Sequence, residues 1–124
     1  MTARSPTVAP VPLTARTFDA ALRSATMPVL VDFWAPWCHA CRQLAPRIEE
    51  LARVWRGRAH VATVNVDDAG RLAERLGVRA LPTVLLFVDG EPAAGLSGPA
   101  SQADLEALLT RYLPVMADTA PGEP

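Results

Sequence analysis

Apolar residues follow two different spacings along the chain, and these spacings predict a succession of strands and helices. Three apolar-rich stretches have the length of strands, at residues 29–35, 59–66 and 83–88. Shorter stretches at 8–13 and 93–97 predict two more strands, the first at a sheet edge because it contains prolines. The segments between them carry apolar residues every three or four positions, so the predicted order is β-α-β-α-β-α-β-β-α.

The predicted helices have recognisable starts. Thr14, Asp67-Asp68 and Ser101 can each cap a helix N-terminus, and Cys38 opens the longest helix. Ser101 and Asp104 have the spacing of a capping box. The expected buried faces consist, helix by helix, of Phe18, Ala21, Leu22 and Ala25; Leu44, Ile48, Leu51, Ala52 and Trp55; Leu72 and Leu76; and Leu105, Leu108, Leu109 and Tyr112.

This order predicts an α/β fold, a three-layer α/β/α sandwich. We expect strands that are joined through helices to be parallel, with right-handed crossovers. Asp89-Gly90 predicts a final hairpin, which adds an antiparallel edge to the sheet. The 124 residues make about one domain. We expect that domain at residues 8–113, between a flexible N-terminal lead-in at 1–7 and a flexible C-terminal tail at 114–124.

Composition and charge narrow the possible partners. Half of the residues are apolar and a fifth are charged, as in globular proteins. The net charge of -1 gives no reason to expect nucleic acid or an anionic membrane as a partner. All twelve basic residues are Arg, which removes Lys as a catalytic group. No apolar stretch is long enough to span a bilayer or resembles an export signal, so we expect a cytoplasmic monomer.

Two cysteines form the clearest chemical motif of the chain. Cys38 and Cys41 follow a predicted buried strand and open a helix, which is the setting of redox-active Cys-x-x-Cys motifs. At the helix N-terminus, unpaired N–H groups and the helix dipole stabilise a Cys38 thiolate. Cys41 lies one turn further on and should be more buried. The pattern predicts that Cys38 attacks a target disulfide and that Cys41 resolves the mixed disulfide.

A zinc site is the alternative interpretation of these cysteines. Tetrahedral zinc needs about four ligands, and the available ones are Cys38, Cys41, His39 and His60. His60 begins a distant strand, so we expect no metal.

Asp32 is the polar exception in the second predicted strand. Burial there would raise the pKa of its carboxyl group, which suits an acceptor for the Cys41 proton. The alternative is that Asp32 only satisfies backbone donors at the end of the strand.

Leu81-Pro82-Thr83 begins the fourth strand, where an X-Pro bond can be cis and can turn the neighbouring backbone toward a ligand. The strand pattern alone favours a trans proline that simply starts the strand. Of the two tryptophans that flank the Cys-x-x-Cys turn, we expect Trp34 in the core. Trp37 is the candidate to cover the cysteines or contact a partner.

Together these segments resemble the thioredoxin family. Residues 31–41 are similar to its active-site segment and residues 78–83 to its cis-proline segment. Asp89-Gly90, Gly98 and Pro46 also fall where that family has counterparts. The resemblance covers roughly residues 13–113 and implies a sheet in the order 1-3-2-4-5 with two helices on each face.

The resemblance also implies roles for individual residues. It implies Cys38 as the nucleophile, Cys41 as the resolving thiol and Asp32 as the general base. It implies a cis Leu81-Pro82 bond beside the cysteines, and a Leu81 backbone that pairs with an extended substrate segment. The expected rim of the site consists of Trp37, Ala80, Leu81, Pro82 and Gly98.

The partners implied by the resemblance are client proteins with disulfides and an NADPH-dependent flavoprotein, thioredoxin reductase, which supplies electrons. No bound cofactor is expected beside the redox-active Cys38–Cys41 disulfide.

Two departures from the family pattern concern redox tuning. His39-Ala40 stands where typical members have Gly-Pro. A protonated His39 near the Cys38 thiolate would make the couple more oxidising, whereas a solvent-facing His39 would have little effect. Thr63 stands where the family often has a lysine, so Asp32 would lack a partner that favours its charged form.

Three functions therefore compete. The first is a reductase of protein disulfides, and the second is a more oxidising oxidase or isomerase, suggested by His39-Ala40. The third is a thioredoxin-like chaperone or binding module that uses the surface around Trp37, Leu81 and Gly98 and does not need both cysteines.

Overall fold

The computed structural model describes residues 9–112. The predicted lead-in at 1–7 and tail at 114–124 lie outside this range. The elements are β1 (Val11–Leu13), α1 (Phe18–Ser24), β2 (Val29–Trp34), α2 (His39–Val54), β3 (His60–Asn65), α3 (Gly70–Arg75), β4 (Thr83–Val88), β5 (Glu91–Ser97) and α4 (Gln102–Tyr112).

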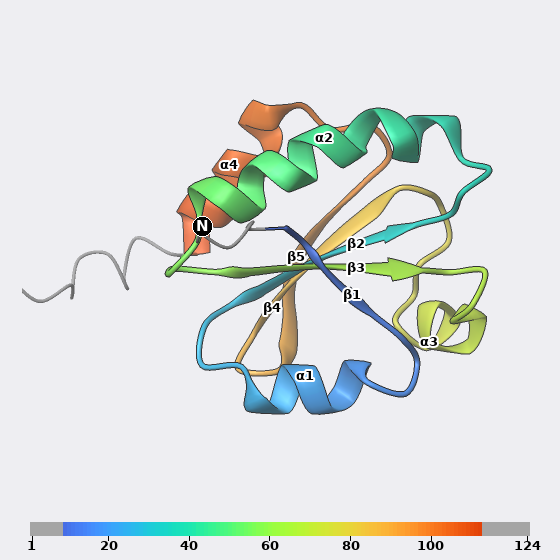
Figure 1. Cartoon of the computed structure of the whole chain (residues 1–124), viewed down its shortest axis with the longest axis horizontal. Coiled ribbons are helices and arrows are strands. Elements are labelled where there is room, and N and C mark those ends of the chain that lie inside the picture. Colours follow the sequence, from blue (N-terminus) through green and yellow to red (C-terminus); the bar gives the residue numbers. More distant parts are fainter. Residues whose placement is uncertain (1–8, 113–124) are drawn as a thin grey trace, which may run out of the picture.

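One five-stranded sheet in the order β1-β3-β2-β4-β5 organises the molecule, as the resemblance implies. β1 and β2 both run parallel to β3, with Asp32 of β2 level with Thr63 of β3. Helices α2 and α4 cover one face of the sheet, and α1 and α3 lie on the other (Figure 1). The predicted three-layer sandwich is thereby confirmed.

The direction of β4 differs from the prediction. We expected helix-joined strands to be parallel, but β4 runs antiparallel to β2. The reason is the length of α3, whose six residues extend only about 9 Å. A six-residue strand such as β3 is about 20 Å long, so α3 cannot return the chain to the start of the sheet. The chain therefore turns round at the end where β2 and β3 finish, and β4 runs back from there.

Two separate apolar layers hold the helices to the sheet. Because successive residues of a strand point to opposite faces, Leu30 packs toward α2 and α4, whereas Val31 and Phe33 pack toward α1 and α3. The expected apolar faces of α2 and α4 are mostly buried, including Leu105 in α4. In α1 and α3 about half of each face is buried, including Phe18 and Leu72, and the rest is half-buried. The sheet is thus buried on both faces, which explains why its central strands are so apolar.

The helix starts confirm one predicted cap and correct two. Ser101 and Asp104 form the predicted capping box, each side chain accepting the other's backbone N–H at 3.0 Å. The N-cap of α1 is Thr17 rather than Thr14, and the Thr17 side chain makes no capping hydrogen bond. At α3 the N-cap is Ala69, because the helix begins at Gly70, beyond Asp67-Asp68.

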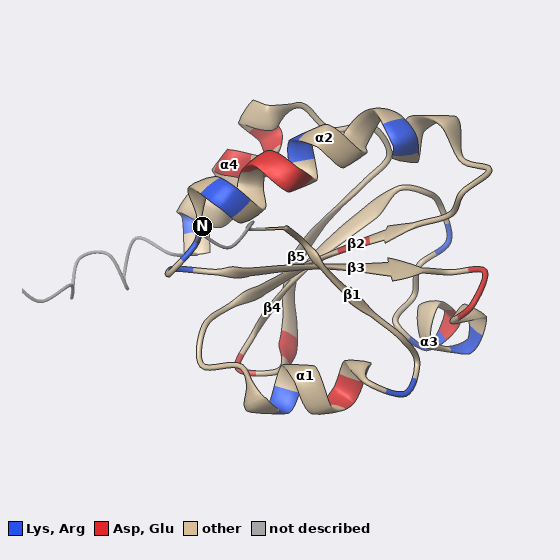
Figure 2. Ribbon diagram, viewed as in Figure 1, with Lys and Arg blue, Asp and Glu red and all other residues tan. Residues whose placement is uncertain are grey.

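Charges of both signs are spread over the helices and turns (Figure 2). Within residues 9–112, no helix has both the length and the apolar character that crossing a membrane requires.

Candidate functional site

The two cysteines form a disulfide at the start of α2, just beyond the end of β2. The strand ends before Pro36, and a turn closed by the Cys38 N–H donating to the Ala35 carbonyl at 3.1 Å leads into the helix. Cys38 occupies the N-cap position, and its Sγ accepts the backbone N–H of Cys41 at 3.2 Å. The Cα atoms of the two cysteines are 5.2 Å apart. The local sequence therefore places the pair at the positive end of the helix dipole.

The two sulfur atoms lie in different surroundings, as predicted. Cys38 is 8 % exposed and Cys41 only 2 %. The first turn of α2 contains no acidic residue that would oppose a thiolate at Cys38. Cys38 is thus the more accessible of the two cysteines, and Cys41 the more buried.

Asp32 lies on β2 and is 3 % exposed. Its Oδ1 has no hydrogen-bond partner among the residues that the structure describes. Burial raises the pKa of the Asp32 carboxyl group to about 7, because desolvation penalises the charged form. Asp32 and Cys41 line a common cavity of about 200 Å³. This arrangement does not fit the alternative in which Asp32 satisfies backbone donors.

His39 and Ala40 occupy the first two positions of α2. The His39 side chain is exposed, and its Nδ1 lies 3.4 Å from a guanidinium nitrogen of Arg42. Another nitrogen of Arg42 donates to the Pro36 carbonyl at 2.8 Å. Arg42 therefore links the His39 ring to the turn before the disulfide.

The tryptophans on either side of the turn have different roles. Trp37 is 67 % exposed, and its indole Nε1 donates to Asp67 at 3.0 Å. Asp67 follows β3, so this bond ties the disulfide turn to the segment before α3. Trp34 is half-buried and packs against the cluster of Ala35, Cys38 and Cys41, so it lies at the edge of the core rather than in the core position expected for it.

Leu81-Pro82 is a cis peptide bond, as the resemblance implies and unlike the trans bond that the strand pattern alone favours. The Thr83 hydroxyl donates to the Ala80 carbonyl at 2.6 Å. On the other side, the Gly98 N–H donates to the Pro82 carbonyl at 2.7 Å. These bonds fix the Ala80–Thr83 segment to β4 and β5 beside the disulfide, where Leu81 packs against the cysteine cluster.

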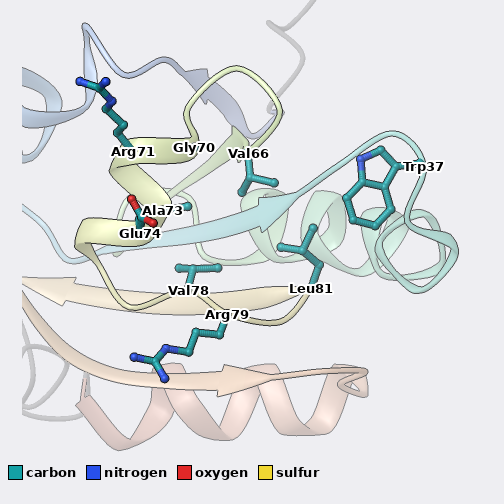
Figure 3. Close-up of a pocket in the computed structure, with 9 residues that line it drawn as sticks. All are labelled: Trp37, Val66, Gly70, Arg71, Ala73, Glu74, Val78, Arg79 and Leu81. Carbon is teal, nitrogen blue, oxygen red and sulfur yellow. The ribbon is translucent and has the colours of Figure 1, made fainter.

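An open cleft of about 600 Å³ begins at Trp37 and Leu81 (Figure 3). It extends toward α3, and neither Ala80 nor Gly98 lines it. Its remaining wall, which the sequence analysis did not single out, consists of Val66, Gly70, Arg71, Ala73, Glu74, Val78 and Arg79.

A metal-binding arrangement is not found in the described part of the chain. Among residues 9–112, no three His, Cys, Asp or Glu side chains are grouped so that they could hold an ion.

The thioredoxin family model matches residues 9–111, which is most of the chain. The chain belongs to the thioredoxin family. Thioredoxin 1 of a Nostoc species is 36% identical over 101 residues, which cover 82% of this chain and 94% of that protein. A mutant thioredoxin from Halobacterium salinarum has a similar solved structure, with a TM-score of 0.78 and 33% identity. That match covers 90% of this chain and 96% of the other.

Chloroplast thioredoxins are also among the relatives. The chloroplastic M-type thioredoxin of Zea mays is 39% identical over 98 residues, which cover 79% of this chain and 59% of that protein. A further chloroplastic relative, thioredoxin M5 of rice (Oryza sativa), is 38% identical over 98 residues. The chain therefore spans a little over half the length of these chloroplastic thioredoxins, 57% in the case of the rice protein.

Proposed function

We propose that this thioredoxin-family chain is a dithiol–disulfide oxidoreductase that reduces disulfides of other proteins. The observation that supports it most is the Cys38–Cys41 disulfide at a helix N-terminus, above the buried carboxyl group of Asp32. Reduction of this bond gives two thiols, and the Cys38 thiolate is the one that the helix end stabilises.

The reaction proceeds by two exchanges. In the first, the Cys38 thiolate attacks a client disulfide, forms a mixed disulfide and releases one client thiolate. In the second, Cys41 gives its proton to Asp32 and attacks the Cys38 sulfur, which releases the other client thiolate and closes the Cys38–Cys41 bond. The client gains two electrons and the protein loses two.

Asp32 serves as the general base of the second exchange. Its pKa of about 7 lies close to neutral pH, where a group can both accept and release a proton readily. The cavity that it shares with Cys41 is large enough for bridging water at about 30 Å³ per molecule, so direct contact of the two groups is not required.

The client segment docks beside the disulfide. Trp37, Leu81 and the apolar wall formed by Val66 and Val78 give a cleft for a side chain of the client. The Leu81 backbone pairs with an extended client segment, and Ala80, Pro82 and Gly98 complete the rim on the side of β5. Main-chain recognition of this kind suits many unrelated disulfide proteins.

Electrons come from an NADPH-dependent flavoprotein, thioredoxin reductase, which reduces the Cys38–Cys41 disulfide after each turnover. This proposal rests on membership of the family. The cytoplasmic location and the monomeric state stay predictions.

Replacing Cys41 with Ser tests the mechanism. The variant keeps the nucleophile but cannot release the client from the mixed disulfide, so we expect mixed disulfides to accumulate. Non-reducing gels separate these species, and mass spectrometry assigns the bond to Cys38. Cys38→Ser is the matched control and should trap nothing. A chaperone or binding module would bind clients equally well with either variant, and unchanged turnover by Cys41→Ser would refute the reductase.

A more oxidising enzyme is the second candidate, because His39-Ala40 lies directly beside Cys38. The reduction potential of the couple, measured against glutathione by Trp fluorescence, separates the two functions. A potential well below the cytosolic glutathione poise supports a reductase, and one near or above it supports an oxidase or isomerase.

A further inference from the structure

The cavity between α2 and the sheet links the buried Asp32 to the surface. Its volume is about 200 Å³, and Asp32 and Cys41 line its inner end. Thr63 lines it from β3, and two charged side chains of α2, Arg42 and Glu49, line it where both are exposed to solvent. The cavity therefore joins the proton donor and the proton acceptor of the second exchange to the outside of the molecule.

The proposed mechanism requires such a route. Asp32 can accept the Cys41 proton only when its carboxyl group is ionised, and with a pKa of about 7 much of this group is protonated near neutral pH, so a proton must leave Asp32 before the second exchange. Asp32 is only 3 % exposed, so it does not exchange protons directly with bulk solvent. Its Oδ1 has no partner among residues 9–112, and Thr63 opposite it is not a base that could take the proton.

Of the two charged groups on this cavity, only Glu49 can accept a proton. The guanidinium of Arg42 carries only hydrogen-bond donors, and it is held by the Pro36 carbonyl and the His39 ring. Glu49 carries a carboxylate, and neither of the two ion pairs found within residues 9–112 involves it. Cys41, Ala45 and Glu49 are spaced four residues apart on α2, so they lie along one side of the helix.

We propose that Glu49 relays protons between Asp32 and solvent through this cavity. The proposal rests on the proposed function. Before the second exchange, water in the cavity carries the proton of Asp32 to the Glu49 carboxylate, which releases it to the solvent, and the ionised Asp32 then accepts the Cys41 proton. In the reverse reaction, Asp32 returns its proton to Cys41, and Glu49 supplies Asp32 with a new one.

The test compares Glu49→Gln with Glu50→Gln. Both substitutions remove one negative charge from neighbouring positions of α2, but Glu50 does not line the cavity and instead pairs with Arg53. Reduced protein is mixed with excess peptide disulfide in a stopped-flow instrument, and Trp fluorescence reports closure of the Cys38–Cys41 bond. As the peptide concentration rises, the observed first-order rate constant reaches a plateau, and this plateau is the rate constant of the second exchange.

In dilute buffer we expect Glu49→Gln to lower this plateau about fivefold, less than the ~10²-fold that a general base itself contributes. Raising the concentration of a small buffer such as imidazole should restore the rate, because a mobile proton carrier replaces the relay. Glu49→Asp should retain the wild-type rate, and Glu50→Gln should match wild type at every buffer concentration.

Two results would overturn the relay: a Glu49→Gln plateau equal to that of wild type, or a deficit that buffer does not restore. Asp32→Asn separates this failure from failure of the function. If Asp32→Asn slows the plateau and Glu49→Gln does not, only the relay is wrong. If wild-type protein never closes the Cys38–Cys41 bond with a disulfide peptide, both proposals fail.

Discussion

Asp32 is a residue of the site that lowers the stability of the fold when its carboxyl group is ionised. Its carboxyl group is buried on β2 without a partner for Oδ1, and its pKa is raised to about 7. In the unfolded chain the same group titrates near 3.9. Between these values the native protein holds a proton that the unfolded chain has lost, so stability falls as pH rises from about 4 to about 7.

Replacing Asp32 with Asn should therefore stabilise the protein above pH 7. A shift of about three pKa units at ~1.4 kcal/mol each sets an upper limit on the order of 4 kcal/mol. We expect a gain on the order of 2 kcal/mol at pH 8, because the buried amide also lacks partners. At pH 4 both carboxyl and amide are neutral, and the gain should vanish. Urea unfolding of the oxidised proteins at the two pH values measures it, and an equal difference at both would contradict the argument.

Thr63 is the position from which the pKa of Asp32 can be changed. It lies level with Asp32 in the β2–β3 register and lines the same cavity. In Thr63→Lys, an ammonium group at the cavity should lower the pKa of Asp32, because it favours the carboxylate. The pH dependence of stability and of client reduction should then shift to lower pH. Thr110→Lys, on the exposed surface of α4, is the control, and equal profiles for both variants would show that Thr63 does not act on Asp32.

Among single residues, the sequence indicates Cys38, Cys41 and Asp32 because a buried strand followed by a helix start defines their surroundings. The structure joins the two cysteines in a disulfide and places Asp32 and Cys41 on one cavity, and the catalytic roles of the three residues stay predictions. The wall of the cleft on α3 was not found, because Val78 and Glu74 come to line one cleft with Trp37 only through the packing of α3 against the sheet end. The distance in sequence between Trp37 and Asp67 hid their hydrogen bond in the same way.

Among the elements, the β4–β5 hairpin depends on a close approach of two backbones. Gly95 of β5 lies level with Leu85 of β4. A Cβ atom at Gly95 would lie 2.7 Å from Leu85 Cδ2 and 3.0 Å from the Val84 carbonyl oxygen. The Leu85 side chain can move aside, but the carbonyl belongs to a central strand that also pairs with β2. The hairpin therefore needs glycine there for space rather than for backbone freedom.

Gly95→Ala should accordingly destabilise the protein by about 1–3 kcal/mol, the usual range for overpacking. Gly70→Ala is the control, because no atom lies within 4 Å of a Cβ there and alanine favours the helix that Gly70 begins. We expect the control to change stability by less than about 0.5 kcal/mol. Thermal and urea unfolding measure the stability of both variants. A Gly95→Ala variant as stable as Gly70→Ala would show that β5 can shift to make room for the added Cβ atom.

The turns between elements were predicted more successfully than the direction of the strands. Asp89-Gly90 and the Ser101–Asp104 capping box predicted their turns correctly, because both are local hydrogen-bond or backbone effects. The direction of β4 was predicted wrongly, because it depends on whether α3 can span the sheet. The spacing of apolar residues indicates that a helix is present, but it predicts the length of that helix poorly.

In the whole molecule, one sheet separates two apolar layers that share its strands. Leu105 belongs to the layer beneath α2 and α4, and Leu72 to the layer beneath α1 and α3. β2 contributes Leu30 to the first layer and Val31 to the second, so neither layer can be lost while the sheet stays intact. The proposed active site lies at the end of β2, the strand that both layers hold. Its geometry should therefore persist until the whole described domain unfolds.

Leu105→Ala and Leu72→Ala test this coupling, one in each layer. Each removes a buried leucine side chain and should lower the free energy of unfolding by about 2–5 kcal/mol. Because the layers share β2, each variant should unfold in a single transition, as domains of this size usually do. Far-UV circular dichroism follows all elements, whereas Trp fluorescence follows Trp34 and Trp37 near the disulfide and Trp55 at the C-terminal end of α2. The two signals should coincide in both variants, and an earlier dichroism change in Leu72→Ala, with fluorescence still native, would show that the α3 side unfolds independently.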